Sequence, residues 1–144
     1  MKPIARHHAR EYAVQAMYQW QLSGAPIADI EAQFLAEHIT EELDLEYFQE
    51  LIRHIPKETE ELNQHMHPFL KRSFKDLDPV ELAILHIGIY ELSKRPDIPY
   101  RVIINEALEL TKKFGSIEGY KFVNGVLDQV ARTLRAHEIA AGKK

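Results

Sequence analysis

The first ten residues, MKPIARHHAR, carry cations at a regular spacing. Lys2, Arg6 and Arg10 follow one another at intervals of four, with His7 and His8 between them. On a helix this interval aligns the side chains about 6 Å apart, since each residue rises about 1.5 Å. Neighbouring phosphates of an extended nucleic-acid strand have a comparable separation, and arginine can direct two donors onto one phosphate. The pattern favours a polyanion site, and a solvated helix end is the plain alternative.

The distribution of charge along the chain supports a localised site. The 144 residues have a formal net charge of -4. Three of the 18 Lys and Arg residues lie in the first ten positions, whereas all 22 Asp and Glu residues come later. Cations at a helix N-terminus oppose the helix dipole and cost about 0.3 to 1 kcal/mol each. An acidic body with a basic tip therefore indicates an anion bound at that tip.

A second candidate site lies in the segment KFVNGVLD, residues 121–128. Its valines and leucine have the spacing of a core face, which leaves Lys121, Phe122 and Asn124 to be explained. A cation, an aromatic ring and an amide provide charge, stacking and base-edge hydrogen bonds, the groups that recognise single-stranded RNA. The alternative is that Phe122 packs in a groove and that Asn-Gly is a helix defect costing about 1 kcal/mol.

No group of residues in the sequence is convincing as a catalytic or metal site. The chain has no cysteine, no glycine-rich phosphate loop and no nucleophile elbow. His65 and His67 do not share a helix face, and no set of carboxylates completes a metal site with them. His86 is interpreted as a hydrogen-bonded core residue, and Glu81 as part of a helix cap. We expect no enzyme, no metal and no cofactor.

The elements that must position these residues are helices, because helical periodicity dominates and no segment alternates as a strand does. The predicted fold class is all-α. Seven helices are expected: one from the start of the chain to about residue 23, then one from residue 27, and others at 44–56, 58–74 with Pro68 bending or breaking it, from 79, at 100–114, and at 117–134. Asp78 and Pro79 give the clearest helix start. The helix after them is apolar on almost all sides and should be central.

The expected architecture is one compact domain over residues 1–138. It consists of two helical sub-bundles, roughly 1–76 and 77–138, followed by a frayed tail at 139–144. The hydrophobic fraction of 45% and charged fraction of 28% are typical of a globular protein. No apolar run approaches the roughly 18 residues of a membrane span. The lack of a signal-peptide core and of cysteine predicts a cytoplasmic protein with no membrane contact.

Taken together, these segments resemble the NusB family of bacterial transcription antitermination factors over nearly the whole chain. The resemblance rests on the basic start, AMYQW in the first helix, ELSKRPDIPY at 91–100, NEALEL at 105–110 and KFVNGVLD at 121–128. It implies an all-helical, non-enzymatic protein that binds boxA RNA in ribosomal RNA transcripts. It also implies a joint partner, the tenth small-subunit ribosomal protein (NusE), and an RNA polymerase complex that reads through terminators.

The resemblance assigns roles to individual residues. The RNA-binding positions that it implies are Lys2, Arg6, His7, Arg10, Phe69, Arg72, Lys121, Phe122 and Asn124. The surface for the ribosomal protein would include Tyr18, Leu22 and Glu81. The family often has arginine at positions 7 and 8, where this chain has histidine. Because histidine is mostly neutral at pH 7, we expect weaker and more pH-dependent RNA binding.

Two other classes of protein stay open at this point. RNA methyltransferases can carry a NusB-like domain, so the chain could be a stand-alone relative of it, although no room is left for a βαβ cofactor unit. Alternatively, the chain could be a helical protein-interaction module whose basic tip is incidental and which binds no RNA. Exposed apolar surface could serve the ribosomal protein or a homodimer of the free protein.

Overall fold

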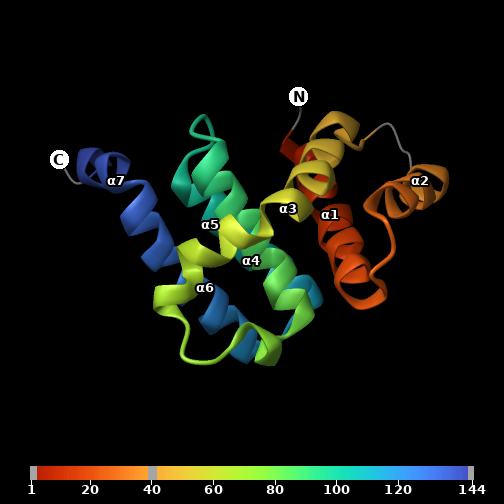
Figure 1. The fold of residues 1–144 in the computed structure, drawn as a ribbon. Coiled ribbons are helices and arrows are strands. Elements are labelled where there is room, and N and C mark those ends of the chain that lie inside the picture. The colour runs from red at the N-terminus through yellow and green to blue at the C-terminus, as the bar shows by residue number, and fades with distance from the viewer. Residues whose placement is uncertain (1–2, 39–41, 143–144) are drawn as a thin grey trace. The chain divides into compact units, whose positions relative to one another are not determined.

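The computed structural model describes residues 3–38 and 42–142, and in these ranges the chain is helical (Figure 1). The helices are α1 (Pro3–Ser23), α2 (Ile27–His38), α3 (Leu45–Met66), η1 (His67–Phe69), η2 (Phe74–Asp76), α4 (Pro79–Lys94), α5 (Tyr100–Phe114), α6 (Ile117–Leu134) and α7 (Ala136–Gly142), where η marks a short 3-10 helix. No strand occurs among the described residues, and the all-α prediction is confirmed. By its internal contacts the chain divides into two units, Met1–Thr59 and Glu60–Lys144.

The expected break between a third and a fourth helix at Pro56 is wrong, because α3 continues through this proline. A proline inside a helix costs about 3 kcal/mol. An apolar stripe nevertheless runs on past it, and its members are almost fully buried: Phe48, Leu51, Ile52, Ile55, Leu62 and Met66. Burying each of them is worth about 1.5 to 3 kcal/mol, which together outweighs the proline. The boundary between the two units consequently falls within α3, whereas the sequence placed it near residue 76.

In the first unit, α1 packs against α2, and both contact the beginning of α3. Phe34 of α2 lies 6.0 Å from the ring of Phe48 in α3, and Tyr12 of α1 stacks on His38 at 4.8 Å. The chain leaves α1 at Gly24, whose φ of +67° lies in the left-handed region that favours glycine. The predicted end of the first helix in SGAP is therefore confirmed.

In the second unit, α4 is the central helix, and α5 and α6 pack against it and against each other (Figure 1). Every residue from 83 to 92 is buried. Close contact with α6 requires a glycine, because a Cβ atom at Gly88 would lie 3.1 Å from both methyl carbons of Leu127. The prediction that this helix is central is confirmed. Among the described residues, no helix combines the length and the hydropathy needed to cross a membrane.

Local signals in the sequence fix the starts of α4 and α6. The Asp78 carboxylate accepts hydrogen bonds from the backbone N–H groups of Val80 (2.8 Å) and Glu81 (3.3 Å). The Ser116 hydroxyl accepts one from the N–H of Gly119 at 3.0 Å. The helix start predicted at Asp78 is confirmed, and Ser116 is the N-cap of α6.

His86 is a core residue, as the sequence predicts. Its Nε2 lies 2.7 Å from Oδ1 of Asn63, and burial lowers the pKa of His86 to about 4. The imidazole is therefore neutral at pH 7, and its Nε2–H donates to the amide oxygen.

One buried arginine holds α7, which continues to Gly142 and so extends into the tail that the sequence predicts to be frayed from residue 139. The Arg135 guanidinium, in a residue only 7% exposed, donates to four backbone carbonyls, those of Glu91 (3.1 Å), Leu92 (2.9 Å), Arg95 (2.9 Å) and Ile98 (3.0 Å). It also pairs with Glu138 of α7 at 2.6 Å. Residues 143 and 144 lie outside the described ranges.

We expect Arg135→Leu to lower the free energy of unfolding by about 3 kcal/mol or more, because it removes hydrogen bonds to four backbone carbonyls and the ion pair with Glu138. Urea denaturation measures this loss. Arg132→Leu is the matched control, since Arg132 lies in the last turn of α6, three residues before Arg135, and 66% of its side chain is exposed. It should change stability little. Equal losses in the two variants would contradict the role given to Arg135.

Candidate nucleic-acid interface

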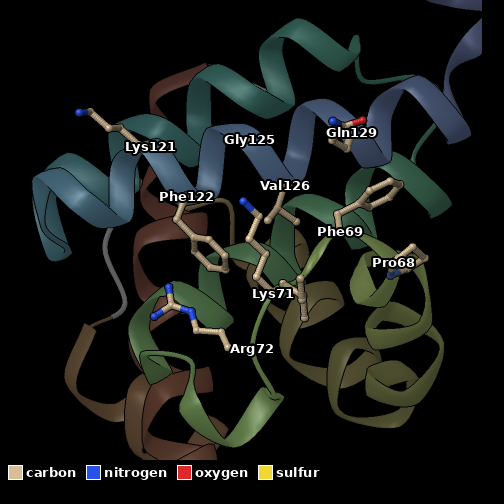
Figure 2. Close-up of a pocket in the computed structure, with 10 residues that line it drawn as sticks. Pro68, Phe69, Lys71, Arg72, Lys121, Phe122, Gly125, Val126 and Gln129 are labelled. Atoms are coloured by element: carbon tan, nitrogen blue, oxygen red, sulfur yellow. The ribbon is translucent and has the colours of Figure 1, made fainter.

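A cavity of about 660 Å³ lies between α6 and the segment that follows α3 (Figure 2). Its lining consists of Pro68, Phe69, Leu70, Lys71, Arg72, Lys121, Phe122, Gly125, Val126 and Gln129. We call this cavity the basic pocket. All of its residues belong to the second unit. Four predicted RNA-binding residues, Phe69, Arg72, Lys121 and Phe122, are therefore brought together from two distant parts of the sequence.

The local sequence explains why these side chains converge. Pro68 lies in the first turn of η1, and the chain becomes extended at Leu70, with φ of -95° and ψ of 140°. This change ends η1 and carries Lys71 and Arg72 along the cavity. On α6, Phe122, Gly125 and Gln129 are three and four residues apart, so they lie on one face of the helix.

Arg72 and Phe122 contact each other directly. The guanidinium carbon lies 4.8 Å from the centre of the ring, and Figure 2 shows the guanidinium turned toward Phe122. A cation over an aromatic face at a surface site is worth about 0.5 to 1 kcal/mol. The contact holds the half-buried ring while the exposed arginine keeps its charge at the edge of the pocket.

The charge of the basic pocket is positive. Lys71, Arg72 and Lys121 line it, and no carboxylate is among its ten lining residues. Rings for stacking, cations for phosphates and an amide are the groups that bind a nucleotide. In contrast, within residues 3–38 and 42–142 no group of three or more His, Asp or Glu side chains is placed to hold a metal ion.

A second cavity of about 740 Å³ adjoins the first, and its charge is opposite. We call it the acidic pocket. Its carboxylates are those of Asp76, Asp78, Glu81 and Glu118. Arg72, Lys121 and Phe122 line both cavities and so form the wall between them.

Glu81 lies at the base of the acidic pocket and is 7% exposed. Its carboxylate packs against Gly119, where any Cβ atom would collide with it. Burial, and then the charge of Asp78, raise the pKa of Glu81, whereas Arg72 acts in the opposite direction. A cationic group entering this cavity would be favoured by the nearby carboxylates.

The amino-terminal cations are arranged differently from the prediction. Lys2 lies outside the described residues. Arg10 is 2% exposed, and its guanidinium lies 5.6 Å from the ring centre of Tyr47, so its side chain is buried where the prediction has it facing a bound strand. Arg6 packs on the same ring at 4.5 Å. The sequence could not show this burial, because Tyr47 belongs to another helix.

Carboxylates of the first unit lie beside the half-buried side chains of Arg6 and His7. Arg6 Nε lies 3.7 Å from Asp44, a long ion pair, and makes no hydrogen bond. His7 Nε2 lies 3.5 Å from Glu11. The protein's own carboxylates thus neutralise part of the basic start.

The remaining predicted residues lie outside the basic pocket. Asn124 is exposed on α6, but it comes two residues after Phe122 and so faces another side of the helix. Tyr18 and Leu22 lie one turn apart on α1 and are 38% and 60% exposed. They form a small apolar surface on the first unit, whereas Glu81 belongs to the second.

Four lining residues were not singled out as site residues in the sequence: Leu70, Lys71, Gly125 and Gln129. Helical periodicity from Phe122 would have found Gly125 and Gln129. The sequence pointed to Lys71 only as the neighbour of Arg72. The expected helix at 58–74 implied a helical backbone for this segment, which is extended at Leu70. The 3-10 turn and the extended residue after it are what direct Lys71 to the cavity.

Known proteins resemble this chain over most of its length. The model of the NusB family matches residues 7–132. The transcription antitermination protein NusB of Idiomarina loihiensis is 53% identical over 94% of this chain and 97% of its own length. That of Sodalis glossinidius is 54% identical over 94% and 97%. These relatives are named for antitermination and not for a reaction, so the expectation of a non-enzymatic protein is confirmed.

Solved structures show the same fold. NusB of T. maritima superposes with a TM-score of 0.75 at 29% identity, over 88% of this chain and 90% of that one. A crystal structure of antitermination factors NusB and NusE in complex with double-stranded RNA gives a TM-score of 0.79 at 27% identity, over 92% and 99%. Family match, sequence identity and helical fold all extend over most of the chain, and the protein therefore belongs to the NusB family.

Proposed function

We propose that this protein is a cytoplasmic transcription antitermination factor that binds boxA RNA of ribosomal RNA transcripts. The observation that carries the proposal is the basic pocket, in which two aromatic rings and three cations surround a cavity without a carboxylate in its lining. The relatives named as antitermination proteins support the same function. So does the solved complex of NusB and NusE with RNA.

In this proposal the basic pocket holds unstacked bases and the phosphates beside them. Bases stack on Phe69 and Phe122, since stacking on an aromatic ring is worth about 1 to 3 kcal/mol per base. Lys71, Arg72 and Lys121 engage phosphates. Asn124 would contact a part of the strand that lies outside the cavity.

The amino-terminal residues supply a second set of contacts on the first unit. Lys2 contributes a positive charge, and His7 a hydrogen-bonding imidazole. Arg6 can turn to a phosphate, because its pair with Asp44 is long and its Nε has no hydrogen bond. Arg10 acts indirectly by packing on Tyr47.

The protein partner in this proposal is the tenth small-subunit ribosomal protein, NusE. Apolar side chains of the partner would cover Tyr18 and Leu22, and basic ones would meet Glu81 in the acidic pocket. The complex would then act on RNA polymerase so that it passes terminators. A homodimer of the free protein could cover the same apolar side chains.

Replacing Lys71 and Lys121 together by glutamine should weaken binding of a boxA RNA and flatten its dependence on salt. Each lost phosphate contact lowers the log-log slope by about 0.7 for a single strand. Fluorescence anisotropy at several salt concentrations measures the slope. Arg132→Gln, on the same helix but outside both cavities, should leave it unchanged. A double variant with the wild-type slope would contradict the assignment of phosphates to this pocket.

Glu81→Gln should weaken binding of the ribosomal protein about tenfold, as expected for loss of one charge pair at an interface. The control Glu109→Gln, at an exposed site on α5, should bind normally. Calorimetric titration measures both. Equal affinity of the Glu81 variant and the wild type would remove Glu81 from the interface.

The same variant should be at least as stable as the wild type at pH 7. The pKa of Glu81 is raised in the folded protein above its ordinary value of 4.5, so the folded state binds more protons than the unfolded state. Wild-type stability therefore falls as pH rises through the window between the two pKa values. Glu81→Gln removes this loss, and urea unfolding at pH 4 and pH 7 should show its relative gain only at the higher pH.

A further inference from the structure

We propose that Gln129 reads one base of the bound strand in the basic pocket and gives that position a preference for adenine. This inference rests on the proposed RNA binding and names a base-specifying residue within it. It starts from the shape of the cavity at α6.

The face of α6 is open in the middle of the pocket. A Cβ atom at Gly125 would have no neighbour within 4 Å, although this residue lines the cavity. A glycine inside a helix costs about 1 kcal/mol relative to alanine. Lys121 precedes this opening by one turn, and Gln129 follows it by one turn. A flat group can therefore lie against the helix backbone between a cation and an amide.

Aromatic rings lie near both ends of the opening at Gly125. Figure 2 shows the Phe69 side chain at the Gln129 end of α6, and Phe122 with Arg72 toward the Lys121 end. The buried side chain of Val126 contributes an apolar surface between them. A base stacked on Phe69 would have its edge close to the Gln129 carboxamide.

Gln129 has the chemistry to read that edge. Of the ten lining residues, it has the one side chain that can both donate and accept hydrogen bonds. The side chain is exposed and makes no hydrogen bond to the described residues. A carboxamide matches adenine in two parallel hydrogen bonds, because the 6-amino group donates and the adjacent ring nitrogen accepts.

The other bases fit less well. On its N7 edge guanine presents two adjacent acceptors, so it offers the carboxamide oxygen no donor there. Uracil can donate from N3–H and accept at O4, but its smaller ring has less stacking surface than adenine. Cytosine offers a donor beside an acceptor, but on a smaller ring with less stacking surface. The pocket volume of about 660 Å³ lies within the usual range for small-ligand cavities and admits the larger purine.

A double-mutant cycle between protein and RNA tests the contact. The probes are oligoadenylate of about twelve nucleotides and the same oligomer made of purine riboside, which lacks the 6-amino group. Binding of the full-length protein is followed by fluorescence anisotropy at low salt. The wild type should bind oligoadenylate about tenfold more tightly than the purine oligomer. Gln129→Leu should bind the two oligomers alike, and Gln64→Leu, at an exposed site of α3, should keep the tenfold difference.

Gly125→Leu provides a second variant, because leucine favours the helix and would fill the opening. It should weaken binding of oligoadenylate about tenfold while circular dichroism shows a folded protein. Wild-type affinity in this variant would place the base elsewhere and overturn the inference.

The results distinguish failure of this inference from failure of the proposed function. An undiminished preference for adenine in Gln129→Leu, or a wild type that prefers oligocytidylate, overturns the role of Gln129 as an adenine reader. In either of these cases, weaker binding of both oligomers by the Lys71 and Lys121 double variant would still support RNA binding at the pocket. If the wild type binds no oligomer and no boxA RNA, both the inference and the proposed function fall.

Discussion

The contact between Arg72 and Phe122 is the interaction on which the candidate site depends. Both residues line the basic pocket and the acidic pocket, so the guanidinium and the ring are the wall between cavities of opposite charge. At 4.8 Å the pair needs no carboxylate to hold the arginine. Its charge therefore acts on both sides, toward an anion in one cavity and on the pKa of Glu81 in the other. RNA would meet the cations of the basic pocket, and a basic protein would meet the carboxylates of the acidic pocket beside it.

The sequence predicted the fold well where local signals and the apolar period agree. The helix start that the sequence predicts at Asp78 is an N-cap in the structure. At Pro56 the signals conflict, since the local backbone rule favours a break and the apolar stripe favours continuation. Burial of Ile52, Ile55 and Leu62 decides the outcome, and its size depends on packing that no local window contains. A similar long-range contact joins Arg135 to carbonyls in the last turn of α4 and after it, and α7 extends into the expected tail.

The candidate site was predictable for residues whose chemistry is local to α6, such as Lys121 and Phe122. The amino-terminal cations show the limit of spacing alone. An interval of four places Arg6 and Arg10 on one side of α1, but that side faces Tyr47, and Arg10 is buried there. Spacing gives the side of a helix on which a residue lies, and the partner helix decides whether that side meets solvent.

Two glycines of α6 explain why this helix accepts weak helix formers. At Gly119 a side chain would collide with the Glu81 carboxylate, so the glycine makes room for a buried acid of the acidic pocket. At Gly125 nothing in the protein fills the space, so packing gives no reason for the glycine. Each position loses about 1 kcal/mol of helix stability relative to alanine. The fold accounts for the loss at Gly119. The loss at Gly125 has a physical reason if a group outside the chain lies against the helix backbone there, as a base in the basic pocket would.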